Sequence, residues 1–126
     1  LINARSESAF ERRTFRDSFR HRRCIITAGG FYEWDKEKTK YSFERKDGPV
    51  MFLAGCYNLY EDGHRFVILT TAANPSMEPV HDRMPLILEP GELKRWLLDD
   101  RAAEQILHNT PALLNVSTEY EQLRLF

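Results

Sequence analysis

The sequence predicts an α+β fold in which a mainly antiparallel β-sheet carries a few short helices. Segments with the alternation or the β-branched content of strands follow one another along the chain. Asp47-Gly48 and Asp62-Gly63 are typical of the tight turns that join antiparallel neighbours. Helical periodicity is confined to one stretch near the start and to short stretches near the end. With 126 residues, 42% of them hydrophobic, we expect one domain over residues 1–126 with a modest core.

The first helical stretch covers residues 6–23, where Phe15 and Phe19 recur four residues apart on one face. Basic side chains occupy the opposite face: Arg12, Arg13, Arg16, Arg20, Arg22 and Arg23. Guanidinium groups bind phosphate through paired hydrogen bonds, so this face suits a nucleic acid. The alternative is a helix face that is simply solvated.

The rest of the chain is predicted to form strands, followed by two helices and a last strand. Strands are expected over residues 24–28, 31–34, 41–45, 50–60, 65–71, 85–88 and 113–116. The strand 65–71 is expected to be central. Short amphipathic helices are expected over residues 91–98 and 101–108, the second capped by Asp99 or Asp100.

The net charge and the cysteine spacing argue against several classes of function. The net charge of −1 does not favour polyanion binding by the chain as a whole, so any nucleic-acid surface must be local. Cys24 and Cys56 lie in apolar segments without the spacing of a metal site or a disulfide framework, so we expect core residues, no metal and no cofactor. No apolar run approaches the roughly 18 residues of a membrane span, and no signal peptide is visible. A cytoplasmic location is therefore expected.

An acidic residue between aromatic rings is the first candidate for chemistry. Glu33 follows a Gly29-Gly30 pair, which permits an unusual backbone or a close approach. The rings beside it can exclude water from its carboxylate and so favour the protonated form, as a general acid requires. In the alternative interpretation, the segment is an ordinary strand. Phe31 and Glu33 would then lie on one face, Tyr32 and Trp34 on the other, and Glu33 would point at solvent.

A histidine and an arginine near the second half of the chain are the next candidates. His81 and Arg83 lie on a loop bounded by prolines, which predicts a fixed direction for both side chains. His81 has the pKa range for proton transfer, although a single histidine is more often structural. The small polar residues from Thr70 to Asn74 leave a strand and could meet a phosphate or a sugar.

Four motifs together carry a family resemblance. They are Asn3-Ala4-Arg5-Ser6-Glu7; Arg22-Arg23-Cys24 running into Gly30-Phe31-Tyr32-Glu33-Trp34; Thr70-Thr71-Ala72-Ala73-Asn74; and His81-Asp82-Arg83-Met84-Pro85. In this combination the chain resembles the SOS response-associated peptidase (SRAP) family, from Asn3 to about Trp96. The resemblance implies a curved, barrel-like antiparallel sheet with short flanking helices. It also implies a role in the DNA damage response, with binding of single-stranded DNA at abasic sites and a covalent thiazolidine link through an N-terminal cysteine.

The resemblance also implies roles for individual residues. Glu33 and His81 match the catalytic glutamate and histidine, and Asn3 matches the asparagine that positions the terminal cysteine. The residues implied in DNA binding are Arg5, Trp34, Thr70, Thr71 and Arg83. We expect Glu33 to be partly buried beside His81.

The chain departs from the family pattern at its start. Neither Cys24 nor Cys56 matches the N-terminal cysteine, so the sequence is interpreted as the C-terminal portion of such a protein, without the nucleophile. An exposed sheet edge would then favour dimers. Two alternatives stay open: a binding module that holds single-stranded DNA without chemistry, and a cysteine peptidase, self-processing or general, assisted by Glu33 and His81.

Overall fold

The computed structural model describes residues 2–9, 11 and 13–118. Its elements are β1 (Ile2–Arg5), η1 (Ser6–Ser8), α1 (Arg13–His21), β2 (Arg23–Ala28), β3 (Phe31–Trp34), β4 (Lys40–Arg45), β5 (Met51–Tyr60), β6 (Gly63–Ala72), β7 (Arg83–Pro85), β8 (Ile87–Leu88), η2 (Pro90–Glu92), α2 (Leu93–Leu98), α3 (Asp100–Ile106) and β9 (Leu114–Thr118). From residue 24 onward the predicted order of strands and helices is observed, with boundaries within three residues of those predicted, except that the strand expected over residues 85–88 is divided into β7 and β8.

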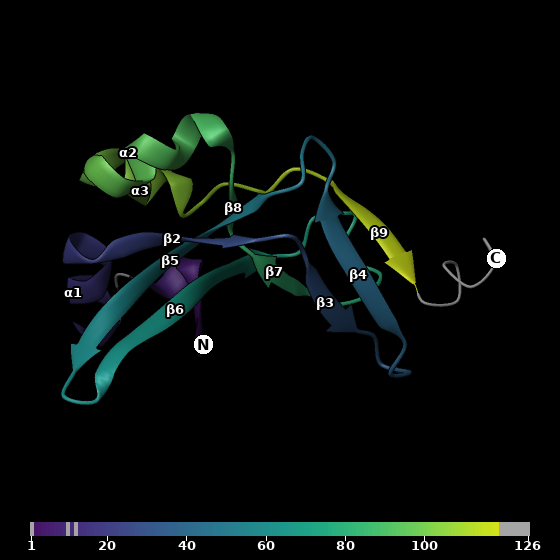
Figure 1. Cartoon of the computed structure of the whole chain (residues 1–126), viewed down its shortest axis with the longest axis horizontal. Coiled ribbons are helices and arrows are strands. Elements are labelled where there is room, and N and C mark those ends of the chain that lie inside the picture. The colour runs from purple at the N-terminus through teal and green to yellow at the C-terminus, as the bar shows by residue number, and fades with distance from the viewer. Residues whose placement is uncertain (1, 10, 12, 119–126) are drawn as a thin grey trace.

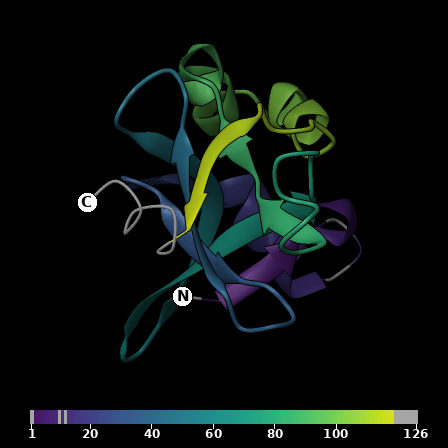
Figure 2. The same ribbon diagram turned by 90° about the vertical axis from the view of Figure 1, so that its right-hand side faces the viewer.

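The strands form two connected sheets that curl into a half-barrel, as expected (Figures 1 and 2). One sheet has the order β1-β6-β5-β2, with β7 added to β6 and β8 to β5. The other has the order β3-β4-β9. The strand predicted to be central is β6, which lies between β1 and β5. Figure 1 shows α2 and α3 together above one end of the larger sheet.

The sheet is mixed rather than purely antiparallel. All described strand pairs are antiparallel except β1 with β6, which run parallel with Asn3 opposite Ile68 and Arg5 opposite Thr70. Sequence patterns identify a strand but not its partner, so this pairing was not anticipated. Because β1 and β2 end the strand order, association through an edge stays a prediction.

Glycines shape the turns and the corner of the half-barrel. Gly48 and Gly63 have φ of 149° and 124° in the two predicted turns. Asp62-Gly63 joins the antiparallel neighbours β5 and β6, as predicted. Asp47-Gly48 joins β4 to β5, which lie in different sheets, so the prediction that this turn joins antiparallel neighbours was wrong. Gly30 serves the corner between β2 and β3, where the chain passes from one sheet to the other (Figure 1). A Cβ atom at Gly30 would lie 2.5 Å from the carbonyl oxygen of Phe43, so the close approach expected of this glycine is observed.

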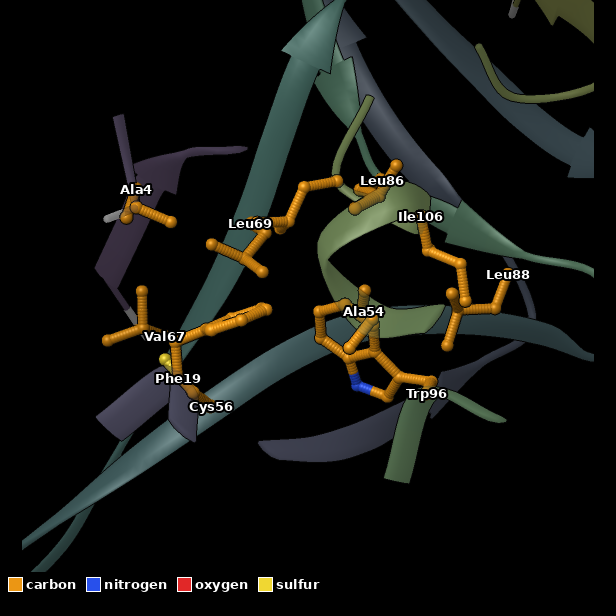
Figure 3. Packing of buried hydrophobic residues seen from close by; sticks show 13 residues of the cluster. Ala4, Phe19, Ala54, Cys56, Val67, Leu69, Leu86, Leu88, Trp96 and Ile106 are labelled. Carbon is orange, nitrogen blue, oxygen red and sulfur yellow. The ribbon is translucent and has the colours of Figure 1, made fainter. Parts of the chain in front are cut away.

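The core consists of two clusters that share β5. One lies between the larger sheet and the helices and centres on Trp96 (Figure 3). The indole N–H of Trp96 donates to the carbonyl of Cys24 at 2.9 Å. Phe19 meets Trp96 edge-on with ring centroids 5.7 Å apart. The second cluster fills the space between the two sheets and includes Phe43, Met51 and Met84. Its position beside β3 and β7 gives the candidate site an apolar base.

The helical prediction over residues 6–23 was too long. The structure has the short η1, then α1, and Arg23 already belongs to β2. Arg23 is a structural residue, with a side chain 3% exposed. It donates to the carbonyls of Phe19 and Trp96 and to Asp100. Arg22 likewise bonds Asp17 and the carbonyl of Tyr57.

The proposed basic face is therefore smaller than the sequence indicates. Arg13, Arg16 and Arg20 are exposed on α1, while Arg22 and Arg23 hold the helix to β2, β5 and α3. Arg12 lies outside the described residues. This favours the alternative that the basic face of the helix is simply solvated, because only some of its arginines are available to a ligand.

Both cysteines are free, and Cys56 is a core residue, as predicted, whereas Cys24 is only partly buried. Cys56 is 1% exposed, and burial raises the pKa of its thiol to about 11. Burial also raises the pKa of the Cys24 thiol. Neither thiol has the environment of an activated nucleophile. Among the described helices, none has the length and apolar character that crossing a bilayer requires.

Candidate active site

A pocket of about 230 Å³ lies where β1, β3, β6 and β7 meet. Its polar lining combines five residues predicted from the sequence: Asn3, Glu33, Thr70, His81 and Arg83. Its apolar wall includes Phe31, Leu53, Ile68 and Met84. Residues up to 82 positions apart are thus brought to one place by the curl of the sheet.

The alternation of β3 delivers Glu33 to this pocket. Phe31 and Glu33 are half-buried, whereas Tyr32 and Trp34 are 59% and 50% exposed. Phe31 stacks on Phe43 of β4 with centroids 4.9 Å apart, which fixes the face that β3 turns inward. The main-chain N–H of Trp34 donates to Glu33 Oε1 at 3.2 Å. The carboxylate therefore lies half in the pocket, not in open solvent.

The first strand places Asn3 and Arg5 on one face of β1. Both are exposed, while Ala4 between them is buried. Asn3 lines the pocket, and Arg5, two residues further along, lies opposite Thr70 of β6 and outside the pocket lining. Arg5 is therefore placed to meet the part of a ligand that leaves the pocket.

The orientation of His81 is set by the main chain. The N–H of Arg83 donates to His81 Nδ1 at 3.1 Å, so this nitrogen is the acceptor and a neutral ring carries its proton on Nε2. Asp82 Oδ1 lies 3.3 Å from the same nitrogen. On protonation, Nδ1–H would face that carboxylate instead. The side chain of His81 is 43% exposed, which gives a ligand access to the ring.

Arg83 is bonded within the protein. Its guanidinium forms a two-pronged ion pair with Glu7 and also donates to the carbonyl and the hydroxyl of Thr70, at 2.9 and 3.1 Å. Hydrogen bonding from Arg83 lowers the pKa of Glu7 to about 2. Sequence reasoning did not single out Glu7, because its partner lies 76 residues away and no local pattern indicates such a pair.

Two residues of the loop motif do not reach the pocket. Thr71 is 8% exposed and follows Thr70 on the opposite face of β6. Asn74 is 2% exposed, and its amide donates to the carbonyls of Pro111 and Ala112 at 2.9 and 3.0 Å. Its side-chain oxygen accepts from Ser76 and Met77. The expectation that this amide meets a phosphate or sugar was wrong, because it holds two segments of the chain together.

A larger hollow of about 820 Å³ adjoins the pocket and shares His81 with it. Its lining is rich in carboxylates: Asp35, Glu37, Glu78 and Asp82. Trp34 also lies in this hollow rather than in the pocket. Lys40 Nζ is 4.1 Å from the centroid of the Tyr32 ring and 5.9 Å from that of Trp34, so β3 and β4 form an aromatic surface with a cation.

Within the described part of the chain, no group of three or more His, Cys, Asp or Glu side chains is arranged to hold a metal ion. A half-buried carboxylate, an imidazole of defined tautomer and an amide face a common space, which suits proton transfer to a bound sugar or carbonyl group.

The family model described as SOS response associated peptidase (SRAP) matches residues 1–123. The chain belongs to the SRAP family. The abasic site processing protein YedK of Escherichia coli is 33% identical over 112 residues, which cover 83% of this chain and 50% of YedK. The abasic site processing protein YoqW of Bacillus subtilis is 38% identical over 106 residues, covering 77% of this chain and 47% of YoqW.

Solved structures also resemble this SRAP chain. A protein from Bacteroides thetaiotaomicron superposes with a TM-score of 0.81 at 29% identity, over 92% of this chain and 57% of the other. One from Bordetella bronchiseptica gives 0.80 at 30% identity, over 92% and 64%. The chain spans about half the length of the curated relatives named above.

Proposed function

We propose that this chain carries the acid, the histidine and part of the DNA surface of an abasic-site cross-linking protein that acts on single-stranded DNA. One observation supports this above the others: Asn3, Glu33 and His81, which the family resemblance implies in catalysis, line one pocket of about 230 Å³. A chain whose relatives are named abasic site processing proteins thus has proton-transfer groups where a sugar-sized ligand fits.

The proposed reaction joins the 1,2-aminothiol of an N-terminal cysteine to the ring-opened abasic sugar. The amine adds to the C1′ aldehyde, and Glu33 protonates the hydroxyl of that adduct, which leaves as water. The thiol sulfur then adds to the carbon of the resulting C=N bond and returns a proton to Glu33. The sum is aldehyde plus aminothiol giving thiazolidine plus water. His81 stabilises charge at the sugar oxygen during ring opening, and Asn3 positions the cysteine.

DNA contacts are assigned to the residues around the pocket. Arg5 is exposed beside the pocket and suits a phosphate, and the Thr70 hydroxyl lies at its edge. The exposed rings of Tyr32 and Trp34 suit stacking with unpaired bases. The carboxylates of the larger hollow repel a backbone, so we expect the strand to pass on the Arg5 side. Thr71, also implied in DNA binding, would act only through its main chain, because its side chain is buried.

The decisive experiment replaces the acid. Glu33→Gln keeps the shape of the side chain but cannot deliver a proton. It should slow covalent capture of abasic single-stranded DNA by the full-length protein by roughly 10²-fold or more, with affinity almost unchanged. Glu104→Gln, an exposed carboxylate on α3, is the matched control and should capture at the parent rate. Equal rates for the parent and Glu33→Gln would remove Glu33 from the mechanism.

A binding module without chemistry is the second candidate, favoured by the aromatic surface of Tyr32, Trp34 and Lys40. Such a protein holds abasic single-stranded DNA reversibly. Heating the complex of the full-length protein in denaturant separates the two functions, because only a covalent adduct survives. Incubation with an unrelated peptide tests for a general peptidase. A general protease cleaves that peptide, whereas a protein that processes only itself leaves it intact.

A further inference from the structure

The outer face of the smaller sheet carries two aromatic rings and a lysine. Trp34 of β3 lies directly opposite Lys40 of β4, and Tyr32 lies opposite Ser42, so these side chains project from one face of the sheet. The rings of Tyr32 and Trp34 are 59% and 50% exposed. Glu33, between them in sequence, projects from the other face and lines the pocket. The same strand therefore supplies the carboxylate of the pocket and one side of an exposed surface with two rings and a cation.

The two rings hold the ammonium group of Lys40. Its Nζ lies 4.1 Å from the centroid of the Tyr32 ring and 5.9 Å from that of the Trp34 ring. A cation within about 6 Å of a ring centroid is attracted by the negative face of the ring. A lysine side chain loses rotamer entropy when a ligand fixes it, and a side chain that is already held loses less. Lys40 therefore presents its positive charge at a defined place before a ligand arrives.

Lys40 and Arg5 lie beside two different walls of the pocket. β1 lines the pocket with Asn3, and β3 lines it with Glu33 and Tyr32. Because β3 is an edge strand of its sheet, Tyr32 reaches the pocket although it belongs to the outer face. Arg5 is exposed on β1, outside the pocket lining. A DNA strand with its abasic sugar in the pocket has a phosphate on each side of that sugar, so each flank can meet one of these cations.

From this arrangement we propose that Lys40 binds a phosphate of the DNA flank that crosses β3, while Arg5 serves the other flank. The proposal rests on the proposed function, because its ligand is single-stranded DNA with an abasic sugar. An ammonium group binds phosphate as a point charge with three donors, so it can keep its ring contacts while it meets a phosphate oxygen. Its charge also offsets carboxylates of the larger hollow, such as Asp35 and Glu37, which repel a backbone on this side.

The salt dependence of binding tests the phosphate contact. The probe is single-stranded DNA with a tetrahydrofuran analogue of the abasic sugar, which has no aldehyde and is bound without being captured. In the full-length protein, Lys40→Gln should lower the slope of log Kobs against log salt by about 0.7, so that a fourfold rise in salt weakens this variant about 2.6-fold less than the parent. A slope equal to that of the parent would overturn the proposal.

Two further variants are the controls for this measurement. Lys40→Arg keeps both the charge and the ring contacts, so it should keep the slope of the parent. Lys46→Gln removes an exposed lysine from the turn after β4, which changes the net charge by the same amount as Lys40→Gln. It should also keep the parent slope. If Lys46→Gln lowered the slope as much as Lys40→Gln does, the effect would be one of net charge, and the assigned contact would be wrong.

Shortened probes show which flank each cation serves. In one probe the analogue is the 5′-terminal nucleotide, and in the other it is the 3′-terminal nucleotide, so each probe keeps a single flank. Lys40→Gln should lower the slope on one of these probes, and Arg5→Gln should lower it on the other. A loss of slope on the same probe in both variants would contradict the assignment of the two cations to different flanks.

The contribution of the rings is tested with Tyr32→Leu, which removes the ring and keeps an apolar side chain. If the ring holds the ammonium group, this substitution should weaken binding more in the parent than in Lys40→Gln, where no ammonium is left to hold. Equal weakening in the two backgrounds would mean that Tyr32 binds DNA independently of Lys40, and the positioning role of the ring would be wrong.

The two proposals fail in different ways. If the parent binds the probe and captures abasic DNA, and Lys40→Gln matches it in slope, the proposed function stands and the role of Lys40 is wrong. If the parent binds the probe with the expected loss of slope in Lys40→Gln but forms no adduct, the cross-linking function is wrong and the phosphate contact stands. A parent that binds no single-stranded DNA would refute both. Thermal unfolding of each variant shows whether it is folded.

Discussion

At the scale of single residues, the site combines groups that sequence could identify with a partner that it could not. Glu33 and His81 stand out because of their neighbours along the chain, and the pocket contains both. Glu7 does not stand out, because its meaning depends on Arg83, 76 residues later. Charge pairing across such a distance is decided by the parallel placement of β1 on β6, which no periodicity reveals.

The ion pair of Glu7 predicts a pH dependence of stability. Arg83 lowers the pKa of Glu7 from 4.5 to about 2. A carboxylate with a lowered pKa in the folded state stabilises the fold above its unfolded pKa, and this stabilisation is lost as the pH falls toward 2. The difference in unfolding free energy between the parent and Glu7→Gln should therefore shrink over that range. Since the Glu7 side chain is 50% exposed, the difference at neutral pH should be on the order of 1 kcal/mol or less.

Urea denaturation at several pH values measures this difference. The other carboxylates with lowered pKa, Asp17 and Asp100, are present in both proteins and cancel in the comparison. A difference that stays constant from neutral pH to pH 2 would mean that Glu7 stabilises the fold by packing alone.

At the scale of elements, β3 depends on the corner that precedes it. Gly30 lets the backbone approach β4 so closely that a side chain would meet the carbonyl of Phe43, while Gly29 has no neighbour within 4 Å of a Cβ atom. The sequence predicted a special role for this pair, but not which of the two glycines carries it. Neither has the positive φ that glycine pairs often supply, since the described glycines with positive φ are Gly48 and Gly63.

Gly30→Ala should therefore destabilise the protein by about 1 to 3 kcal/mol, the usual cost of forcing atoms into a filled space. The neighbouring Gly29→Ala should be neutral or slightly stabilising, because it restricts the unfolded chain without a clash. Chemical denaturation of both variants checks the pair. If both substitutions lower the free energy of unfolding equally, the conformational freedom of glycine determines stability at this corner, and the close contact between Gly30 and Phe43 does not.

At the scale of the whole molecule, the half-barrel is closed by contacts between segments far apart in sequence. Alternation and turn residues predicted the strands, because these signals are local. Ala4 of the parallel β1 packs in the cluster beside the helices, and Leu114 of β9 packs in the cluster between the sheets, so both placements are properties of the assembled chain. Asn74 shows the same limit of local signals. As a polar residue after a strand it was expected to bind a ligand, but its buried side chain instead holds two segments of the chain together.

Removing that tie should loosen the end of the chain from the sheets. Asn74→Ala leaves the carbonyls of Pro111 and Ala112 and the donors of Ser76 and Met77 without their partner, and should cost at least about 2 kcal/mol. Asn115→Ala, exposed on β9, should be close to neutral. Hydrogen exchange of β9 amides should accelerate in Asn74→Ala only. Equal exchange in both variants would show that β9 is held by its strand pairing alone.

The burial of the two cysteines has a consequence for chemical labelling. With a thiol pKa of about 11, Cys56 is almost entirely un-ionised at neutral pH, and Cys24 is shifted in the same direction. Alkylating reagents attack thiolates, so the buried Cys56 should stay unmodified while the fold is intact and react once it opens, whereas the partly buried Cys24 should react slowly. The rate at which a reagent such as iodoacetamide modifies Cys56 would then follow the opening of the half-barrel. Any cysteine placed in the pocket would be modified selectively, against a slow background.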